Sequence, residues 1–162
     1  MEKFKRVPAH IGIIPDGNRR WAQQNGLNKE DGYAHGIEPG FRLYELLLEY
    51  GVGEATFYGF TKDNNKRVQK QRDAFTKACV EAVELLSGKD ANLLVVGNTE
   101  SPAFPEQLKK YANRRVCFGT GKINLNFLVN YDWEWDLRGL AEDGRLKSAD
   151  IPRMDMVIRW GG

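Results

Sequence analysis

The fold is decided by the stretch HIGIIPDGNRRW, which spans residues 10–21. Its apolar residues 11–14 predict a short buried strand that ends at Pro15 and Asp16. Gly17 allows a tight turn, and the residues from Asn18 onward are typical of the first turns of a helix. This arrangement favours an anion, above all a phosphate, because backbone N–H groups at a helix start are unpaired and the helix dipole is positive there.

The charged side chains of this stretch refine that prediction. Arg19 and Arg20 fall in the first helical turn, where the dipole disfavours them unless an anion lies in front. Asp16 would repel a bare phosphate, but it can hold a divalent cation beside one. The stretch therefore indicates a metal-assisted diphosphate site. It lacks the glycine patterns of phosphate-binding loops and dinucleotide folds, so an ordinary strand–turn–helix with exposed arginines stays an alternative.

Composition indicates a globular protein. The 162 residues are 41% hydrophobic and 28% charged, which is typical of one domain with a substantial core. The formal net charge is +2, from 24 Lys and Arg against 22 Asp and Glu. Such a weak balance argues against a nucleic-acid partner held by bulk charge.

Cysteine usage and hydropathy bear on location. Cys79 and Cys117 have no metal-binding spacing, and a packed, reduced Cys79 indicates a reducing compartment. The sequence has no apolar run of about 18 residues and no apolar signal core near its start. We therefore expect a cytoplasmic protein without a membrane span, although contact with a membrane surface stays compatible with a lipid-like substrate.

The rest of the chain alternates expected strands and helices, which favours an α/β fold with a mostly parallel sheet and helices on both faces. The apolar face of the helix at 73–86 fits either core or the wall of an apolar tunnel. We expect a loop at 25–36; helices at 38–50, 73–86 and from 133 to 140; a short, solvated polar helix at 105–113; strands at 54–60, 92–96 and 122–130; and a last buried strand at 155–159.

A dense polar loop, TKDNNKR at residues 61–67, follows the expected second strand. In parallel sheets, ligands bind at the carboxyl ends of the strands. This loop and Asp16 should therefore lie on the same edge of the sheet. That shared edge is the strongest sign of a site.

Four stretches resemble motifs of the cis-prenyltransferases, the undecaprenyl diphosphate synthase family, and they occur in the family's order. They are HIGIIPDGNRRWA at 10–22, YGFTKDNNKR at 58–67, LNFLVNY at 125–131 and DMVIRWGG at 155–162. The resemblance implies a central, mostly parallel sheet flanked by helices, with an apolar tunnel between the sheet and two helices. It also implies that residues 1–162 form a single domain whose C-terminal part is absent.

The resemblance implies a Mg²⁺-dependent transferase of isoprenoid biosynthesis that condenses isopentenyl diphosphate with an allylic diphosphate, as a homodimer. By position, Asp16 is the catalytic carboxylate that assists Mg²⁺ and the diphosphate, and Asn64 assists removal of a proton. On residue type alone, Asn64 is a typical turn residue and Arg67 a typical solvated side chain. The residues implied to bind substrate are Gly17, Asn18, Arg19, Arg20, Trp21, Lys29, Tyr33, Thr61, Lys62, Asp63, Asn65, Arg67 and, at the second diphosphate, Arg159.

The sequence departs from the family pattern at several places. Lys29 replaces an arginine and loses its bidentate fork, Tyr33 replaces a histidine, and Asn65 replaces a tryptophan. The segment 67–97 is about one helical turn, or about 5.4 Å, shorter than in long-chain members. That difference favours a shallower tunnel and a short- or medium-chain product.

Family members also continue beyond Gly162. Either the natural chain continues in a disordered tail, or it is truncated and has little turnover. We favour the first, because a chain ending at its last core strand leaves a flank uncovered. Two other functions stay open: irregular head-to-middle coupling of the lavandulyl type, and a non-catalytic diphosphate-binding scaffold subunit.

Overall fold

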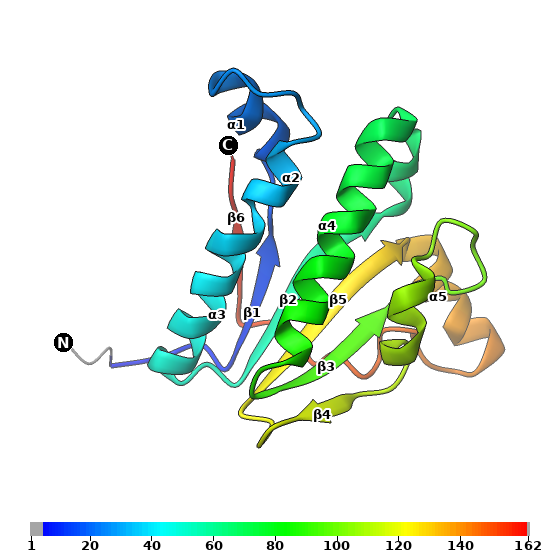
Figure 1. The fold of residues 1–162 in the computed structure, drawn as a ribbon. Helices are drawn as coiled ribbons and strands as arrows, with labels where there is room; N and C mark the ends of the chain where they lie inside the picture. The colour runs from blue at the N-terminus through cyan, green and yellow to red at the C-terminus, as the bar shows by residue number, and fades with distance from the viewer. Residues whose placement is uncertain (1–4, 162) are drawn as a thin grey trace.

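A six-stranded sheet forms the centre of the computed structural model, which describes residues 5–161. The strand order is β4-β3-β5-β2-β1-β6, and every neighbouring pair is parallel except β3 and β4 (Figure 1). This confirms the expected mostly parallel sheet. The strands are β1 (His10–Ile14), β2 (Glu54–Thr61), β3 (Ala91–Val96), β4 (Val116–Phe118), β5 (Ile123–Tyr131) and β6 (Met156–Arg159).

Helices flank this sheet, and α3 and α4 lie side by side over one of its faces (Figure 1). The α-helices are α1 (Asn18–Gln24), α2 (Gly32–His35), α3 (Ile37–Tyr50), α4 (Gln69–Ser87) and α5 (Trp133–Glu142). Two 3-10 helices, η1 (Lys62–Lys66) and η2 (Glu106–Tyr111), follow β2 and β3. No helix within residues 5–161 is long and apolar enough to cross a membrane.

The face beneath α3 and α4 carries the main hydrophobic core. Alternate strand residues point toward it, because successive side chains of a strand face opposite sides of the sheet. From α4, Cys79, Val83 and Leu86 join this buried cluster. The face of 73–86 is therefore core in part, while the apolar tunnel stays a prediction. Burial raises the pKa of the Cys79 thiol to about 12, so the thiol is neutral and shielded.

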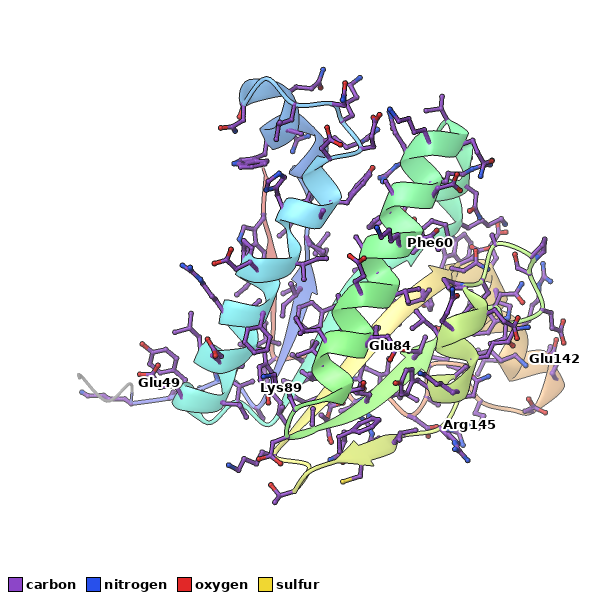
Figure 2. The ribbon with its side chains drawn as sticks, viewed as in Figure 1. Glu49, Phe60, Glu84, Lys89, Glu142 and Arg145 are labelled. Atoms are coloured by element: carbon purple, nitrogen blue, oxygen red, sulfur yellow. The ribbon has the colours of Figure 1, made fainter. Side chains whose placement is uncertain are left out.

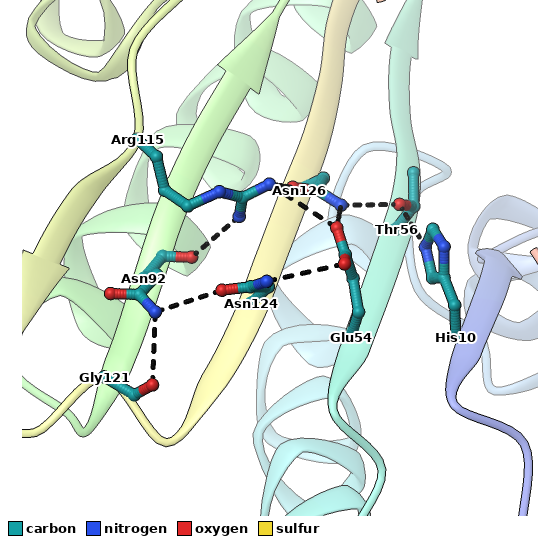
Figure 3. Close-up of polar contacts among 8 residues, drawn as sticks. All are labelled: His10, Glu54, Thr56, Asn92, Arg115, Gly121, Asn124 and Asn126. Atoms are coloured by element: carbon teal, nitrogen blue, oxygen red, sulfur yellow. Dashed lines mark hydrogen bonds and ion pairs between the residues drawn. The ribbon is translucent and has the colours of Figure 1, made fainter. Parts of the chain in front are cut away.

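The opposite face of the sheet carries a buried polar network (Figure 3). Asn126 donates to Glu54 Oε1 at 2.7 Å and to Thr56 Oγ1 at 2.9 Å. Arg115 donates to Asn126 Oδ1 at 2.8 Å and contacts Glu54 Oε1 at 3.4 Å. His10 pairs with Thr56 at 2.8 Å. These hydrogen bonds offset the cost of burying polar groups and join β1, β2 and β5 to the segment before β4.

A smaller apolar group, formed by Leu94, Val96 and Leu128, lies on the same side of the sheet as the network. Trp135 of α5 packs against it. The expected helices on both faces are therefore present, although the second face combines apolar and polar contacts.

Three sequence predictions need correction. The last strand is not buried: β6 is a sheet edge paired with β1, and Val157 is 56% exposed. The helix expected at 105–113 is the 3-10 helix η2, and it is not solvated throughout, because Leu108 and Tyr111 are buried in the core. The loop expected at 25–36 contains α2.

Candidate active site

The carboxyl ends of β1 and β2 bring the two polar stretches together. β1 pairs with β2 in parallel register, so the turn after β1 and η1 after β2 lie at one edge of the sheet. A cavity of about 230 Å³ opens there, and Asp16, Asn64 and Arg67 are among the residues that line it. The shared edge predicted from the sequence is therefore present.

The turn after β1 depends on Gly17. Its φ of 95° lies in the left-handed region, which residues other than glycine rarely adopt. Its N–H donates to Asp16 Oδ1 at 2.7 Å, and this bond orients the carboxylate at the rim of the cavity. The glycine turn predicted from the sequence thus positions the acidic group.

Two arginines lie against the Asp16 carboxylate. Arg159 of β6 donates to Asp16 Oδ2 at 2.7 Å, and Arg20 of α1 lies 3.9 Å from the same oxygen. The hydrogen bond from Arg159 is the main reason that the pKa of Asp16 lies below its usual value. The carboxylate is therefore ionised at neutral pH and partly neutralised by its neighbours.

Positive charge predominates around the cavity. Arg19, Arg20 and Arg67 line it together with Asp16, and the first turn of α1 holds no acidic residue. Three arginines that line one cavity together with a single carboxylate suit a ligand with several negative charges, because guanidinium binds phosphate oxygens through charge-assisted hydrogen bonds.

The helix η1 fixes the other polar wall. Thr61 N donates to Asn64 Oδ1 at 2.9 Å, and Thr61 Oγ1 donates to the same oxygen at 3.3 Å. The bond from Thr61 N is one half of a capping box, and the other half is the bond from the Asn64 backbone N–H to the Thr61 side chain. The Asn64 side chain is thus held at the cavity, with its amide NH₂ as the group that can donate to a ligand.

The helix α2 supplies Tyr33. A Cβ at Gly32 would collide with the Asn18 carbonyl, so the glycine allows α2 to pack closely on α1. Tyr33 is buried, lines the cavity and accepts a 2.8 Å hydrogen bond from Arg67 Nη1. The family resemblance named Tyr33 and Arg67 as two separate substrate-binding residues, and the structure shows that they form a hydrogen bond with each other.

The structure divides the predicted site residues into two groups. The lining contains Asp16, Gly17, Asn18, Arg19, Arg20, Tyr33, Thr61, Asn64 and Arg67, and Arg159 reaches it through Asp16. The remaining predicted residues are not among the residues that line this cavity: Trp21, Lys29, Lys62, Asp63 and Asn65.

Three residues of this second group make contacts with neighbouring elements. Trp21 is 43% exposed and packs on His35. Lys62 pairs with Asp132 at 2.7 Å, and Asn65 donates to Asn130 at 3.3 Å. These side chains connect the rim of the site to neighbouring elements.

Two aromatic lining residues, Tyr58 and Phe75, were not predicted as site residues. Tyr58 alternates outward on β2, and Phe75 belongs to an apolar helix face that fits an ordinary core. Neither position carries a polar pattern from which a site could be inferred.

Comparison with known proteins identifies the family. The family model described as "Putative undecaprenyl diphosphate synthase" matches residues 14–162. The chain belongs to this family. An isoprenyl transferase of Heliobacterium mobile is 28% identical, with 97% of this chain and 70% of the relative covered. A ditrans,polycis-undecaprenyl-diphosphate synthase of Xanthomonas axonopodis, named as specific for (2E,6E)-farnesyl diphosphate, is 30% identical, with 96% and 70% covered.

A solved structure shows the same fold. It is the lavandulyl diphosphate synthase of Lavandula x intermedia in complex with dimethylallyl diphosphate. The alignment has a TM-score of 0.69 at 18% identity and covers 94% of this chain and 77% of the other. This chain therefore has the α/β fold of the cis-prenyltransferases.

The residues present set a limit on how this prenyltransferase could hold a metal. Within residues 5–161 no group of three or more His, Cys, Asp or Glu side chains is placed to bind an ion. Mg²⁺ commonly binds through one or two carboxylates together with substrate phosphates. Asp16 fits that mode, as a single carboxylate beside a cavity suited to a diphosphate.

Proposed function

We propose that this chain condenses isopentenyl diphosphate with an allylic diphosphate bound in the cavity at Asp16. One observation carries the proposal: three arginines and one carboxylate line a cavity that the aromatic residues Tyr33 and Phe75 also line. The polar part matches a diphosphate, and the aromatic part matches an isoprenoid group. Family membership supports the same reaction.

The reaction requires departure of the allylic diphosphate. The bond between C1 and the diphosphate oxygen breaks with both electrons on oxygen, and the double bond of isopentenyl diphosphate attacks C1. A proton is then lost from C2 of the isopentenyl unit, which gives the new double bond. Arg20 and Arg67 would stabilise the leaving group as negative charge builds on it.

Mg²⁺ is proposed as the cofactor, and when bound it neutralises charge on the diphosphate. Asp16 would hold it. Arg159 donates to Asp16 Oδ2, so it would have to release this oxygen to the ion, and we propose that it then binds the diphosphate of the second substrate.

Asn64 is proposed to orient rather than to accept the proton. Its side chain is a neutral amide, and its oxygen already accepts from Thr61. The departing diphosphate is a stronger base than the amide, so it is the proposed acceptor of the proton. Asn64 would donate from its NH₂ group to a diphosphate oxygen.

We also propose a homodimer in the cytoplasm. On α5, the side chains Trp133, Leu137 and Leu140 are 64%, 45% and 51% exposed, and apolar groups gathered in this way favour an interface. Both cysteines are free, which fits a reducing compartment. Light scattering after gel filtration should give twice the mass of one chain.

Product analysis tests the proposed reaction. Purified protein is incubated with labelled isopentenyl diphosphate, Mg²⁺ and dimethylallyl, geranyl or farnesyl diphosphate, and the products are sized after dephosphorylation. We expect a regular cis product from at least one allylic substrate. A branched product from dimethylallyl diphosphate alone would indicate irregular coupling instead. Absence of every product, with diphosphate binding retained, would indicate a scaffold subunit.

A further inference from the structure

The aromatic end of the cavity at Asp16 is closely packed. Tyr33 of α2 stacks on Phe75 of α4 with ring centroids 4.8 Å apart and planes inclined by 21°. Both rings line the cavity. They therefore lie where the hydrocarbon part of a bound allylic diphosphate would leave the polar end.

Arg67 fixes these two rings. Its guanidinium carbon lies 5.1 Å from the centre of the Phe75 ring and 5.9 Å from that of Tyr33, distances at which a cation attracts an aromatic face. Its Nη1 also donates to the Tyr33 hydroxyl at 2.8 Å. One side chain thus connects α2 and α4 from the loop after η1.

The space behind Phe75 is filled by the core. Phe60, labelled beside α4 in Figure 2, lies with its ring centroid 5.6 Å from that of Phe75 and is 2% exposed. Cys79 and Val83 follow on α4, and Val83 is fully buried. A long isoprenoid tail that ran past Phe75 along α4 would have to displace this ring and open the core.

We propose that Tyr33, Arg67 and Phe75 restrict the allylic substrate to a five-carbon group. This inference rests on the proposed function, and it names the substrate within that class. The cavity of about 230 Å³ is smaller than typical pockets for drug-sized ligands, which begin at about 300 Å³. It suits a diphosphate carrying a short group, in contrast to the farnesyl substrate named for the Xanthomonas relative.

Binding and turnover test the restriction separately. Dissociation constants are measured with non-ionising thiolodiphosphate analogues of dimethylallyl and farnesyl diphosphate, and kcat/KM is measured for the two substrates with isopentenyl diphosphate. For the unmodified chain, we expect the five-carbon compound to be preferred at least tenfold in the dissociation constant and at least tenfold in kcat/KM. In Phe75→Ala, removal of the ring opens a path, and we expect the preference to fall at least tenfold, through gains with farnesyl compounds.

Two further variants separate the proposed restriction from general damage. Tyr33→Phe keeps the ring but removes the hydroxyl that accepts from Arg67, so we expect a smaller loss of the preference. Lys77 lies on the exposed side of α4, the helix that carries Phe75. The variant Lys77→Ala should therefore keep the substrate preference of the unmodified chain. Circular dichroism melting shows whether each variant is folded.

The outcomes distinguish the two proposals. Equal binding and use of five- and fifteen-carbon compounds by the unmodified chain, or an unchanged preference in folded Phe75→Ala, would overturn the restriction and leave the reaction standing. If no substrate is condensed while the analogues still bind, the proposed reaction fails, and the ratio of dissociation constants alone decides on the restriction. If neither analogue binds, both proposals are overturned.

Discussion

The buried polar network gives the sharpest stability prediction, through Arg115→Met. Methionine keeps most of the apolar stem and removes the guanidinium group. Asn126 Oδ1, in a residue that is fully buried, then loses its 2.8 Å donor, and an unsatisfied buried acceptor costs about 1–3 kcal/mol. Glu54 loses its ion pair with Arg115, which is partly screened and has an N–O distance of 3.4 Å. We expect this loss to lower the free energy of unfolding by about 1 kcal/mol.

Together, the two losses should lower the free energy of unfolding by about 3 kcal/mol. The loss at Glu54 is not larger, because its carboxylate keeps the amide donors of Asn124 and Asn126. For a chain of this size, the combined loss lowers the melting temperature by about 6–12 °C. Urea unfolding followed by circular dichroism measures it. The neighbouring exposed Arg114→Met is the matched control and should change the free energy by about 0.5 kcal/mol or less. If Arg115→Met matched that control, the network would not stabilise the sheet as described.

Three other predictions concern single side chains. Asp16→Asn should lower condensation about a hundredfold or more while binding of inorganic diphosphate without Mg²⁺ is kept or strengthened, and unchanged turnover would remove this carboxylate from the mechanism. A thiol reagent should label the exposed Cys117 in the folded chain and the buried Cys79 only after unfolding; rapid labelling of both would contradict the burial. Asp155 accepts from the backbone N–H of His10, the main reason that its pKa lies below its usual value of 3.8. The hydrogen bond of the ionised Asp155 carboxylate therefore stabilises the β6 edge fully above pH 3.8, and this stabilisation disappears as the pH falls through the lowered pKa. At neutral pH, hydrogen exchange at the His10 amide should be faster in Asp155→Ala than in the unmodified chain. Equal exchange rates in the two proteins would show that the bond is not formed.

The edge of the sheet that holds the site could be predicted because it depends on local signals. An apolar run ending at Pro15 and Asp16, a glycine with positive φ and a polar loop after a second strand each constrain nearby backbone. Parallel pairing of β1 and β2 then places both loops together. The family motifs assigned residues to this edge, and most of the residues around the cavity come from them.

The remaining features depend on contacts between distant residues. Nothing in the alternation of β5 shows that Asn126 is buried against Glu54 rather than solvated, because a polar residue on a strand has the same pattern in both cases. Val157 illustrates the reverse error: an apolar strand was predicted as buried, yet its edge position leaves it exposed. Phe75 has the pattern of a core residue, and only the position of α4 makes it part of the cavity.

The most direct test of the proposed site is a crystal structure with dimethylallyl thiolodiphosphate and Mg²⁺. We expect the diphosphate in the cavity beside Asp16, in contact with Arg20 and Arg67, and the five-carbon group against Tyr33 and Phe75. A diphosphate bound away from Asp16 and these arginines would contradict the assignment.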